Sequence, residues 1–281
     1  MAIGRWPDVD STSAAVGCRP VPELREGFND VAELYDRIRP KYPDALFEEL
    51  FLRLPERADV VEVGPGTGQA TGSLLARGAR VTAVELGADL AARLRLNFGQ
   101  GEDLHIVVSS FEDAVLPARS FDALVAATAY HWVEKPARLE KPPSLLRPGG
   151  WVAIIDTVQV TAGSDRGFFD RVQPIYDRHG QGRSANYSPP PSPERATGHF
   201  VAELESSPLY EVPNLYRYRW DQTYDTAAYA DLMRSYSESR AMGEEAREAL
   251  IGDISELIDN EFAGRVTRPL VITLTLARTM L

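Results

Sequence analysis

The feature that most constrains this chain is a short apolar run that leads directly into a glycine-rich turn. The run Val60–Val63 is followed by Gly-Pro-Gly-Thr-Gly at residues 64–68, with glycine at every second position. Glycine is needed where the backbone takes a positive φ, or where a ligand must touch the chain with no Cβ between them. The pattern therefore predicts a buried strand that carries a ligand-binding loop to the edge of a sheet.

Strand-like and helix-like segments alternate from this point to residue 156. The patterns predict strands at Arg80–Val84, His105–Val108, Phe121–Ala126 and Trp151–Asp156, and helices at Gln69–Ala76, Ala88–Phe98 and Pro136–Leu146. We expect Arg147-Pro148-Gly149-Gly150 to be the turn that ends the last of these helices. Such alternation indicates βαβ units, and continuously apolar strands indicate a parallel sheet covered on both faces.

The alternation stops after Asp156. Residues 187–193 read Tyr-Ser-Pro-Pro-Pro-Ser-Pro, which suits neither a regular helix nor a central strand. We expect this region to be an insertion over the carboxyl edge of the sheet. The remaining pattern predicts a strand near Leu215–Trp220, helices at Thr226–Ser239 and Glu244–Phe262, and a last strand at Arg268–Ala277.

These patterns divide the chain into consecutive parts. We expect a flexible N-terminal arm at 1–27, covering helices at 28–56, a Rossmann-like core at 57–160, a cap at 161–210, and a segment at 211–281 that completes the sheet and adds two helices.

Composition excludes several classes of protein. The formal net charge of −11 disfavours nucleic-acid and membrane partners, because phosphate backbones and anionic lipids repel an acidic surface. The single cysteine, Cys18, cannot form an internal disulfide, and the N-terminal residues lack a signal-peptide pattern, so we expect a cytoplasmic protein. The four histidines show no metal-binding spacing, and we expect no metal.

Polar and small residues follow three of the predicted strands. Glu85 ends one strand at the interval where a carboxylate can accept hydrogen bonds from the hydroxyls of a ribose. Ser110, Phe111 and Glu112 follow the next strand, where they can surround an adenine ring. Ala127 and His131 follow the strand at Phe121–Ala126. Ligands bind outside the carboxyl ends of such strands, which predicts one nucleoside site at this edge.

The spacing of the glycines argues against two common phosphate-binding loops. The dinucleotide pattern G-x-G-x-x-G would need glycine at Gln69, and the Gly-Lys-Ser/Thr of a Walker loop is absent. Pro65 also removes an amide that could bind phosphate. The loop therefore suits an uncharged or cationic group, although a nicotinamide-dependent dehydrogenase stays an alternative.

Taken as a set, these motifs resemble class I S-adenosylmethionine-dependent methyltransferases. The resemblance covers residues 57–156 and is nearest to the small-molecule branch (methyltransferase type 11) that includes trans-aconitate-type enzymes. The preceding Tyr35-x-x-x-Arg39-Pro40-x-Tyr42-Pro43 resembles the N-terminal element of that branch. The resemblance implies a seven-stranded, mostly parallel sheet with an antiparallel last strand and a cap of helices and loops.

The resemblance also implies roles for individual residues. The cofactor would be S-adenosylmethionine, the product S-adenosylhomocysteine, and no metal would be required. Cofactor-binding positions carried over from the family are Tyr35, Arg39, Glu62, Gly64, Gly66, Gly68, Glu85, Leu86, Ser110, Phe111, Glu112 and Ala127.

Methyl transfer requires alignment more than side-chain chemistry, because the sulfonium is already activated. A base is needed only where the acceptor loses a proton. His131 is the first candidate for that role and Tyr35 the second.

The acceptor is less well defined by the sequence. Six aromatic residues between 216 and 236 suit a flat aromatic or heteroaromatic small molecule, such as an indole or phenol of specialised metabolism. Ordinary packing explains the same residues equally simply. A carboxyl O-methyltransferase of a small polycarboxylic acid is one alternative, for which Arg39, Arg183, Arg195, Arg217 and Arg219 are available. A cofactor-binding protein without methyl transfer is another. The methylated atom and the oligomeric state do not follow from the sequence.

Overall fold

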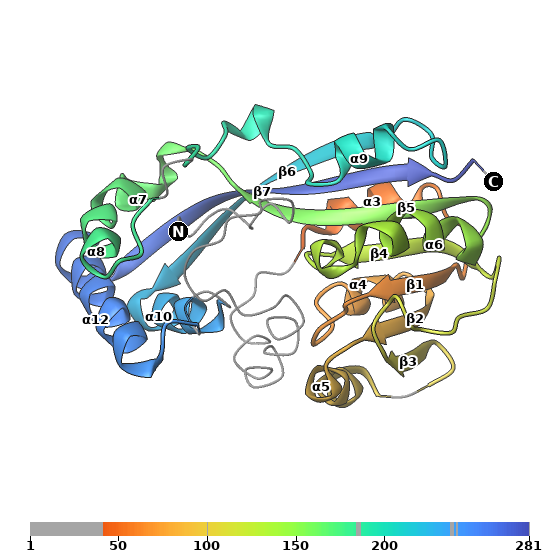
Figure 1. Cartoon of the computed structure of the whole chain (residues 1–281), viewed down its shortest axis with the longest axis horizontal. Helices are drawn as coiled ribbons and strands as arrows, with labels where there is room; N and C mark the ends of the chain where they lie inside the picture. Colours follow the sequence, from red (N-terminus) through yellow and green to blue (C-terminus); the bar gives the residue numbers. More distant parts are fainter. Residues whose placement is uncertain (1–41, 100, 184–186, 237–238, 240, 281) are drawn as a thin grey trace.

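The computed structural model describes residues 42–99, 101–183, 187–236, 239 and 241–280 (Figure 1). The core elements are α3 (Asp44–Phe51), β1 (Asp59–Val63), α4 (Thr71–Leu75), β2 (Arg80–Glu85), α5 (Ala88–Phe98), β3 (Leu104–Val108), β4 (Phe121–Ala127), α6 (Lys135–Leu145) and β5 (Leu146–Gln159). The later elements are α7 (Phe168–Arg171), α8 (Gln173–Arg178), α9 (Val201–Glu205), β6 (Asn214–Asp225), α10 (Thr226–Ser235), α12 (Glu244–Glu261) and β7 (Arg265–Arg278). Short 3-10 turns are η2 (Tyr130–Trp132), η3 (Gly163–Asp165) and η4 (Pro193–Arg195).

The strands form one seven-stranded sheet in the order β3-β2-β1-β4-β5-β7-β6. Strands β1 to β5 pair with one another in parallel, and β7 runs antiparallel between β5 and β6. This arrangement confirms the predicted α/β fold with a mostly parallel sheet and an antiparallel last strand.

Helices cover both faces of the sheet because the central strands are apolar on both sides. One apolar cluster joins α3, α4 and α5 to the strands through residues such as Phe47, Leu74 and Leu94. A second cluster lies on the opposite face with Leu145, Phe200 and Leu204, which belong to α6 and to the segment around α9. The helix at Asp44–Phe51 corresponds to the end of the predicted covering region.

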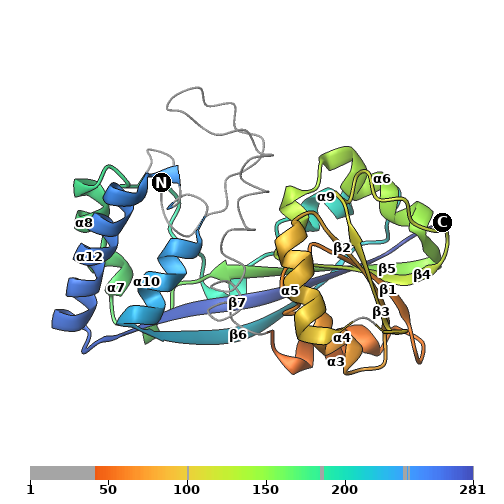
Figure 2. The same cartoon turned by 90° about the horizontal axis from the view of Figure 1, so that it is seen from below.

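A separate group of helices packs at the far end of the three longest strands. Strands β5, β6 and β7 continue past the parallel core, and α7, α8, α10 and α12 gather where they end (Figures 1 and 2). A third apolar cluster, including Phe168, Tyr229, Ile254 and Val266, holds this group together. We call α7, α8, α10 and α12 the helical cap.

The structure differs most from the predicted boundaries in two places. Strand β5 begins at Leu146, so Arg147–Gly150, which we expected to form a turn, lies within the strand. Gly149 has φ +74° and the pairing with β4 shifts between Phe121 and Ala123, which together let the irregular stretch stay in the sheet. The region 161–210 also divides: α7 and α8 join the cap, whereas α9 packs on the core.

No described helix combines the length and apolar character needed to cross a membrane.

Candidate functional site

The glycine loop lies at the carboxyl end of β1 and holds a conformation that side chains would disturb. Gly64, Gly66 and Gly68 have φ values of +63°, +60° and +104°. A Cβ at Gly64 would lie 2.6 Å from Cβ of Ala129, and one at Gly68 would lie 2.2 Å from the Phe98 ring. The backbone of the loop is therefore packed closely between β4 and α5.

Glu85 fixes the same loop from the neighbouring strand. Its side chain is buried, and its Oε2 accepts a hydrogen bond from the Gly66 amide at 2.9 Å. Its Oε1 accepts one from the Gly87 amide at 2.8 Å. Burial raises the pKa of Glu85, while these amide bonds oppose that effect. A carboxylate offers about four acceptor positions, so both oxygens can still accept hydrogen bonds from a diol.

Glu62 is the most heavily buried acid at this edge, with 1% of its side chain exposed. Its Oε2 accepts a hydrogen bond of 2.6 Å from the Thr71 hydroxyl, but within the described part of the chain its Oε1 has no hydrogen-bond partner. Burial raises the pKa of Glu62 to about 7, against the effect of the Thr71 bond, and the charge of Glu85 adds to the rise. A buried carboxylate with one free oxygen favours a bound cation.

The loop after β4 completes this edge with a feature that the sequence did not reveal. Ala127 ends β4 and is half-buried, and Thr128 has φ +51°, an unusual value for a β-branched residue. The Thr128 amide donates to the carbonyl of Ile155 at 2.8 Å, and its Oγ1 lies 3.1 Å from the hydroxyl of Tyr42. Strained backbone of this kind is often found at ligand sites. Tyr42 belongs to the N-terminal motif, but pattern alone gave no reason to single out Thr128.

His131 lies in η2, directly after this loop. Its ring is half-buried and packs against Trp132 with the ring centroids 4.9 Å apart. The adjacent Tyr130 is buried and donates a hydrogen bond of 2.5 Å to the carbonyl of Arg138. The neighbouring residue thus anchors the turn that presents His131.

Ser110, Phe111 and Glu112 follow β3 but make mostly structural contacts. Phe111 is buried in the core cluster, with Lys141 placed 5.0 Å from its ring centroid. One Glu112 oxygen accepts a hydrogen bond of 2.9 Å from the Glu134 amide at the start of α6. Ser110 donates to Asp113 at 2.7 Å.

Three further predicted positions complete the account. Leu86 is half-buried beside Glu85. Tyr35 and Arg39 lie outside the described residues.

The residues at this edge fit the cofactor that the family resemblance implies. The unpartnered Oε1 of Glu62 offers a negative charge to a cationic group, and Glu85 offers acceptors to a ribose. Gly64 and Gly68 let the loop pack against Ala129 and Phe98, where a Cβ would clash. Among the described residues, no group of three or more His, Cys, Asp or Glu side chains is placed to hold a metal ion.

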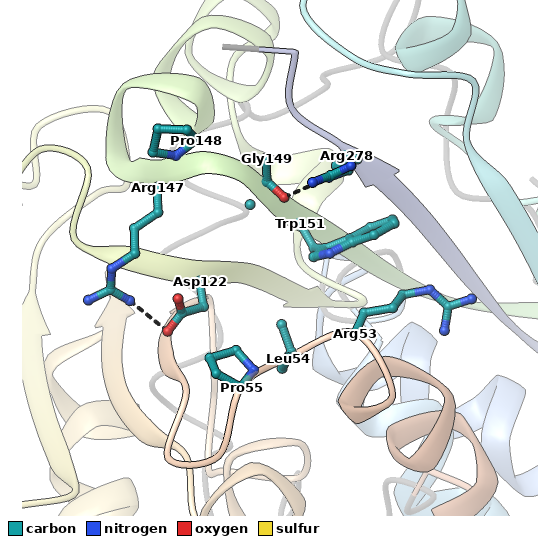
Figure 3. Close-up of a pocket in the computed structure, with 10 residues that line it drawn as sticks. Arg53, Leu54, Pro55, Asp122, Arg147, Pro148, Gly149, Trp151 and Arg278 are labelled. Carbon is teal, nitrogen blue, oxygen red and sulfur yellow. Dashed lines mark hydrogen bonds and ion pairs between the residues drawn. The ribbon is translucent and has the colours of Figure 1, made fainter.

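A cavity of about 310 Å³ lies at the opposite edge of the sheet (Figure 3). It is lined around the starts of β4 and β5 by Asp122, Arg147 and Trp151, with Arg278 at the end of β7. Arg147 pairs with Asp122 at 2.6 Å and with Asp59 at 2.7 Å. This cavity faces the amino ends of the parallel strands, whereas ligands of such sheets bind at the carboxyl ends.

The strand order and the site at the carboxyl edge define a class I S-adenosylmethionine-dependent methyltransferase fold. Comparison with known proteins agrees, since residues 61–154 match the family described as "Methyltransferase domain". The chain therefore carries a methyltransferase domain over these residues.

Similar proteins extend this comparison. An uncharacterized methyltransferase from Mycobacterium tuberculosis is 31% identical over 133 residues, which make up 47% of this chain and 53% of that protein. The chain thus spans about half the length of the curated relatives it matches. A candidate type II methyltransferase from Anaeromyxobacter dehalogenans has a similar structure, with TM-score 0.57 and 22% identity over 86% of this chain and 97% of that one.

A phosphoethanolamine N-methyltransferase from Haemonchus contortus, solved with S-adenosylhomocysteine and phosphomonomethylethanolamine, gives TM-score 0.51 and 14% identity over 94% of this chain and 60% of that one. At these identities the two structures show a shared fold.

Proposed function

We propose that this protein transfers a methyl group from S-adenosylmethionine to a small-molecule acceptor. The observation that carries the proposal is Glu62, a buried carboxylate whose free Oε1 lies beside the glycine loop and Glu85. A buried, partly unpaired acid costs stability unless a cation compensates it. The ammonium group at the amino-acid end of S-adenosylmethionine supplies such a cation, and the matched methyltransferase domain supports the same ligand.

In this proposal the residues of the chain bind and orient rather than react. When bound, the cofactor supplies an activated methyl group on a sulfonium. Glu85 accepts hydrogen bonds from the ribose, Glu62 faces the positive charge, and the backbone at Gly64 and Gly68 limits how far the ligand can shift. Leu86 and the residues 110–112 would lie around the adenine, and Ala127 leaves room at the end of β4.

His131 is the proposed base for acceptors that lose a proton. It follows β4 closely enough to face an acceptor beside Ala127, and its unperturbed pKa is near neutrality. The N-terminal motif with Tyr35 and Arg39 is proposed to close over the same site. Both roles rest on the sequence pattern.

We further propose that the acceptor is a flat aromatic or heteroaromatic metabolite, handled in the cytoplasm without nucleic-acid or membrane partners. The aromatic residues of β6 and the acidic composition support this proposal. Tyr216, Tyr218 and Trp220 pack on the core cluster beside α3, so part of the aromatic set serves the fold. The helices α7 and α8 of the helical cap, which lie within the predicted segment 161–210, are the proposed cover of the acceptor.

Calorimetric titration of the purified protein with S-adenosylhomocysteine and, separately, with NADH tests the cofactor. We expect micromolar binding of the first and none of the second. Binding of NADH alone would instead support a dehydrogenase. If S-adenosylhomocysteine binds, release of S-adenosylhomocysteine from S-adenosylmethionine is then measured across a panel of phenols, indoles and aromatic acids. Tight binding without turnover on any of them would favour a cofactor-binding protein that transfers no methyl group.

A further inference from the structure

Arg268 lies on β7 at the junction between the core and the helical cap. Along one face of β7, Val266 belongs to the apolar cluster of the cap, and Ile272 belongs to the cluster of the core. Because side chains of a strand alternate between faces, Arg268 lies on the same face between these two residues. A charged residue thus interrupts two apolar clusters at the point where they meet.

The hydrogen bonds of Arg268 leave part of its guanidinium unused. Its Nη1 donates to the hydroxyl of Tyr236, and its Nη2 donates to Oε1 of Gln159 at 3.1 Å. Its Nε is buried and has no hydrogen-bond partner among the described residues. A guanidinium carries five N–H donors, and an adjacent Nε and Nη form the fork that binds carboxylate or phosphate with two parallel hydrogen bonds.

Among the residues that the structure describes, no carboxylate pairs with Arg268, in contrast to other arginines of the cap. Arg171 pairs with Glu261, Arg178 with Asp253 and Arg234 with Glu248. Arg268 contacts tyrosines instead: the ring of Tyr236 lies 5.9 Å from its guanidinium carbon, and Tyr229 and Tyr224 are its other electrostatic neighbours. A buried arginine nitrogen that no described group of the chain satisfies can donate to an anionic ligand.

Burial raises the pKa of Tyr229 and of the nearby Tyr176, so both hydroxyls remain protonated at neutral pH. Among the described residues, the groups that contact Arg268 are phenols and an amide rather than carboxylates.

Strand register places Arg268 in line with the proposed methyl-transfer site. Ala127 of β4 pairs with Ile155 of β5, and Gln159 lies four residues further along β5 toward the cap. At a rise of about 3.3 Å per residue, this separation is about 13 Å along the strand. Ile155 and Gln159 share one face, which is also the face of Arg268.

We propose that Arg268, with Gln159 and Tyr236, binds an anionic group of the methyl acceptor, a carboxylate or a phosphate at the end remote from the methylated atom. This inference rests on the proposed function. It makes the acceptor an acidic small molecule, and it adds an arginine that the sequence alone did not single out.

Saturation-transfer NMR titrations test this subsite with pairs of probes that differ in charge. The acids are 4-hydroxybenzoate, indole-3-acetate and phenyl phosphate, and the neutral counterparts are 4-hydroxybenzamide and indole-3-acetamide. With the protein saturated with S-adenosylhomocysteine, at least one acid should bind about tenfold or more tightly than its amide. The affinity for phenyl phosphate, compared with the affinities for the two carboxylates, shows which of the two anionic groups the subsite prefers.

Arg268→Gln should remove the preference for the acid and leave the affinity for S-adenosylhomocysteine unchanged. Arg268→Lys should keep a smaller preference, because lysine retains charge but not the fork. The matched control is Arg57→Gln, which removes an exposed arginine paired with Asp103 and should change neither affinity.

Equal binding of acids and amides, absence of binding by every acid, or an unchanged preference in Arg268→Gln would each overturn the inference. Failure of the proposed function is seen separately, as loss of S-adenosylhomocysteine binding in the wild-type protein. In that case the same probe pairs, titrated into the free protein, still decide the role of Arg268.

Discussion

Replacing Glu62 by glutamine should make the stability of the protein less sensitive to pH. The pKa of Glu62 rises from 4.5 to about 7 on folding, mainly through burial. The folded protein therefore holds this proton more tightly than the unfolded chain does. The resulting penalty is absent below the unfolded pKa, grows as the pH rises from 4.5 to about 7, and is complete above that. Its full size is about 3 kcal/mol.

Urea unfolding followed by circular dichroism at about pH 5 and about pH 8.5 measures this effect. Between these pH values the stability of Glu62→Gln relative to wild type should rise by about 2 to 3 kcal/mol. Comparing the two pH values cancels any constant cost of burying the amide. The exposed Glu56→Gln is the control and should show no such change.

The same substitution should weaken binding of S-adenosylhomocysteine by about 10- to 100-fold near pH 8.5, since a charge-assisted contact is lost. A pH-independent stability difference would refute the assignment of the raised pKa. Unchanged affinity would refute the role of Glu62 in binding the cofactor.

Other substitutions at the site have equally direct readouts. Glu85→Ala should abolish detectable S-adenosylhomocysteine binding in calorimetry, because it removes both the ribose acceptors and the support of the Gly66 amide; retained affinity would contradict this. Gly64→Ala should lower the free energy of unfolding, measured with urea, by about 1 to 3 kcal/mol and weaken binding of S-adenosylhomocysteine, because alanine disfavours the positive φ and its Cβ would contact Ala129. The control Gly78→Ala has a positive φ but open space around the added Cβ, so it should lose only the stability that the unfavourable φ costs. His131→Ala should lower turnover far more than cofactor affinity, and equal turnover in both proteins would leave His131 a packing residue.

The sequence predicted the parts of the fold that depend on local pattern. The apolar strands and amphipathic helices around α5 and β2 follow directly from residue periodicity, and their alternation limits the topology to a parallel sheet. Gly64 and Glu85 were singled out because they occupy fixed positions relative to a strand end, and Glu62 through the family resemblance; their roles stay predictions. Gly149 and Gly150 misled the pattern, because a bulge in β5 keeps them within the strand.

Long-range contacts were the part that pattern could not reveal. Thr128 gained significance only when its positive φ and its contact with Tyr42 became visible. Arg268 looked like an ordinary strand residue near the start of the predicted last strand. Its Nη atoms donate to Tyr236 and Gln159, which come from distant parts of the chain, and only this arrangement shows that the Nε is left unsatisfied by the described residues.

The three long strands that connect the core and the helical cap fix the distance between these two ends of the molecule. Since β5, β6 and β7 are continuously paired, the helical cap cannot rotate relative to the core about a hinge without breaking hydrogen bonds between these strands. Spacing between the two ends can change only by lengthening or shortening paired strands. Because successive side chains of a strand point to opposite faces of the sheet, only a change of two residues in strand length keeps each side chain on its face. Each such step changes the distance by about 6.6 Å. Relatives with such insertions or deletions should therefore accommodate acceptors of discretely different length.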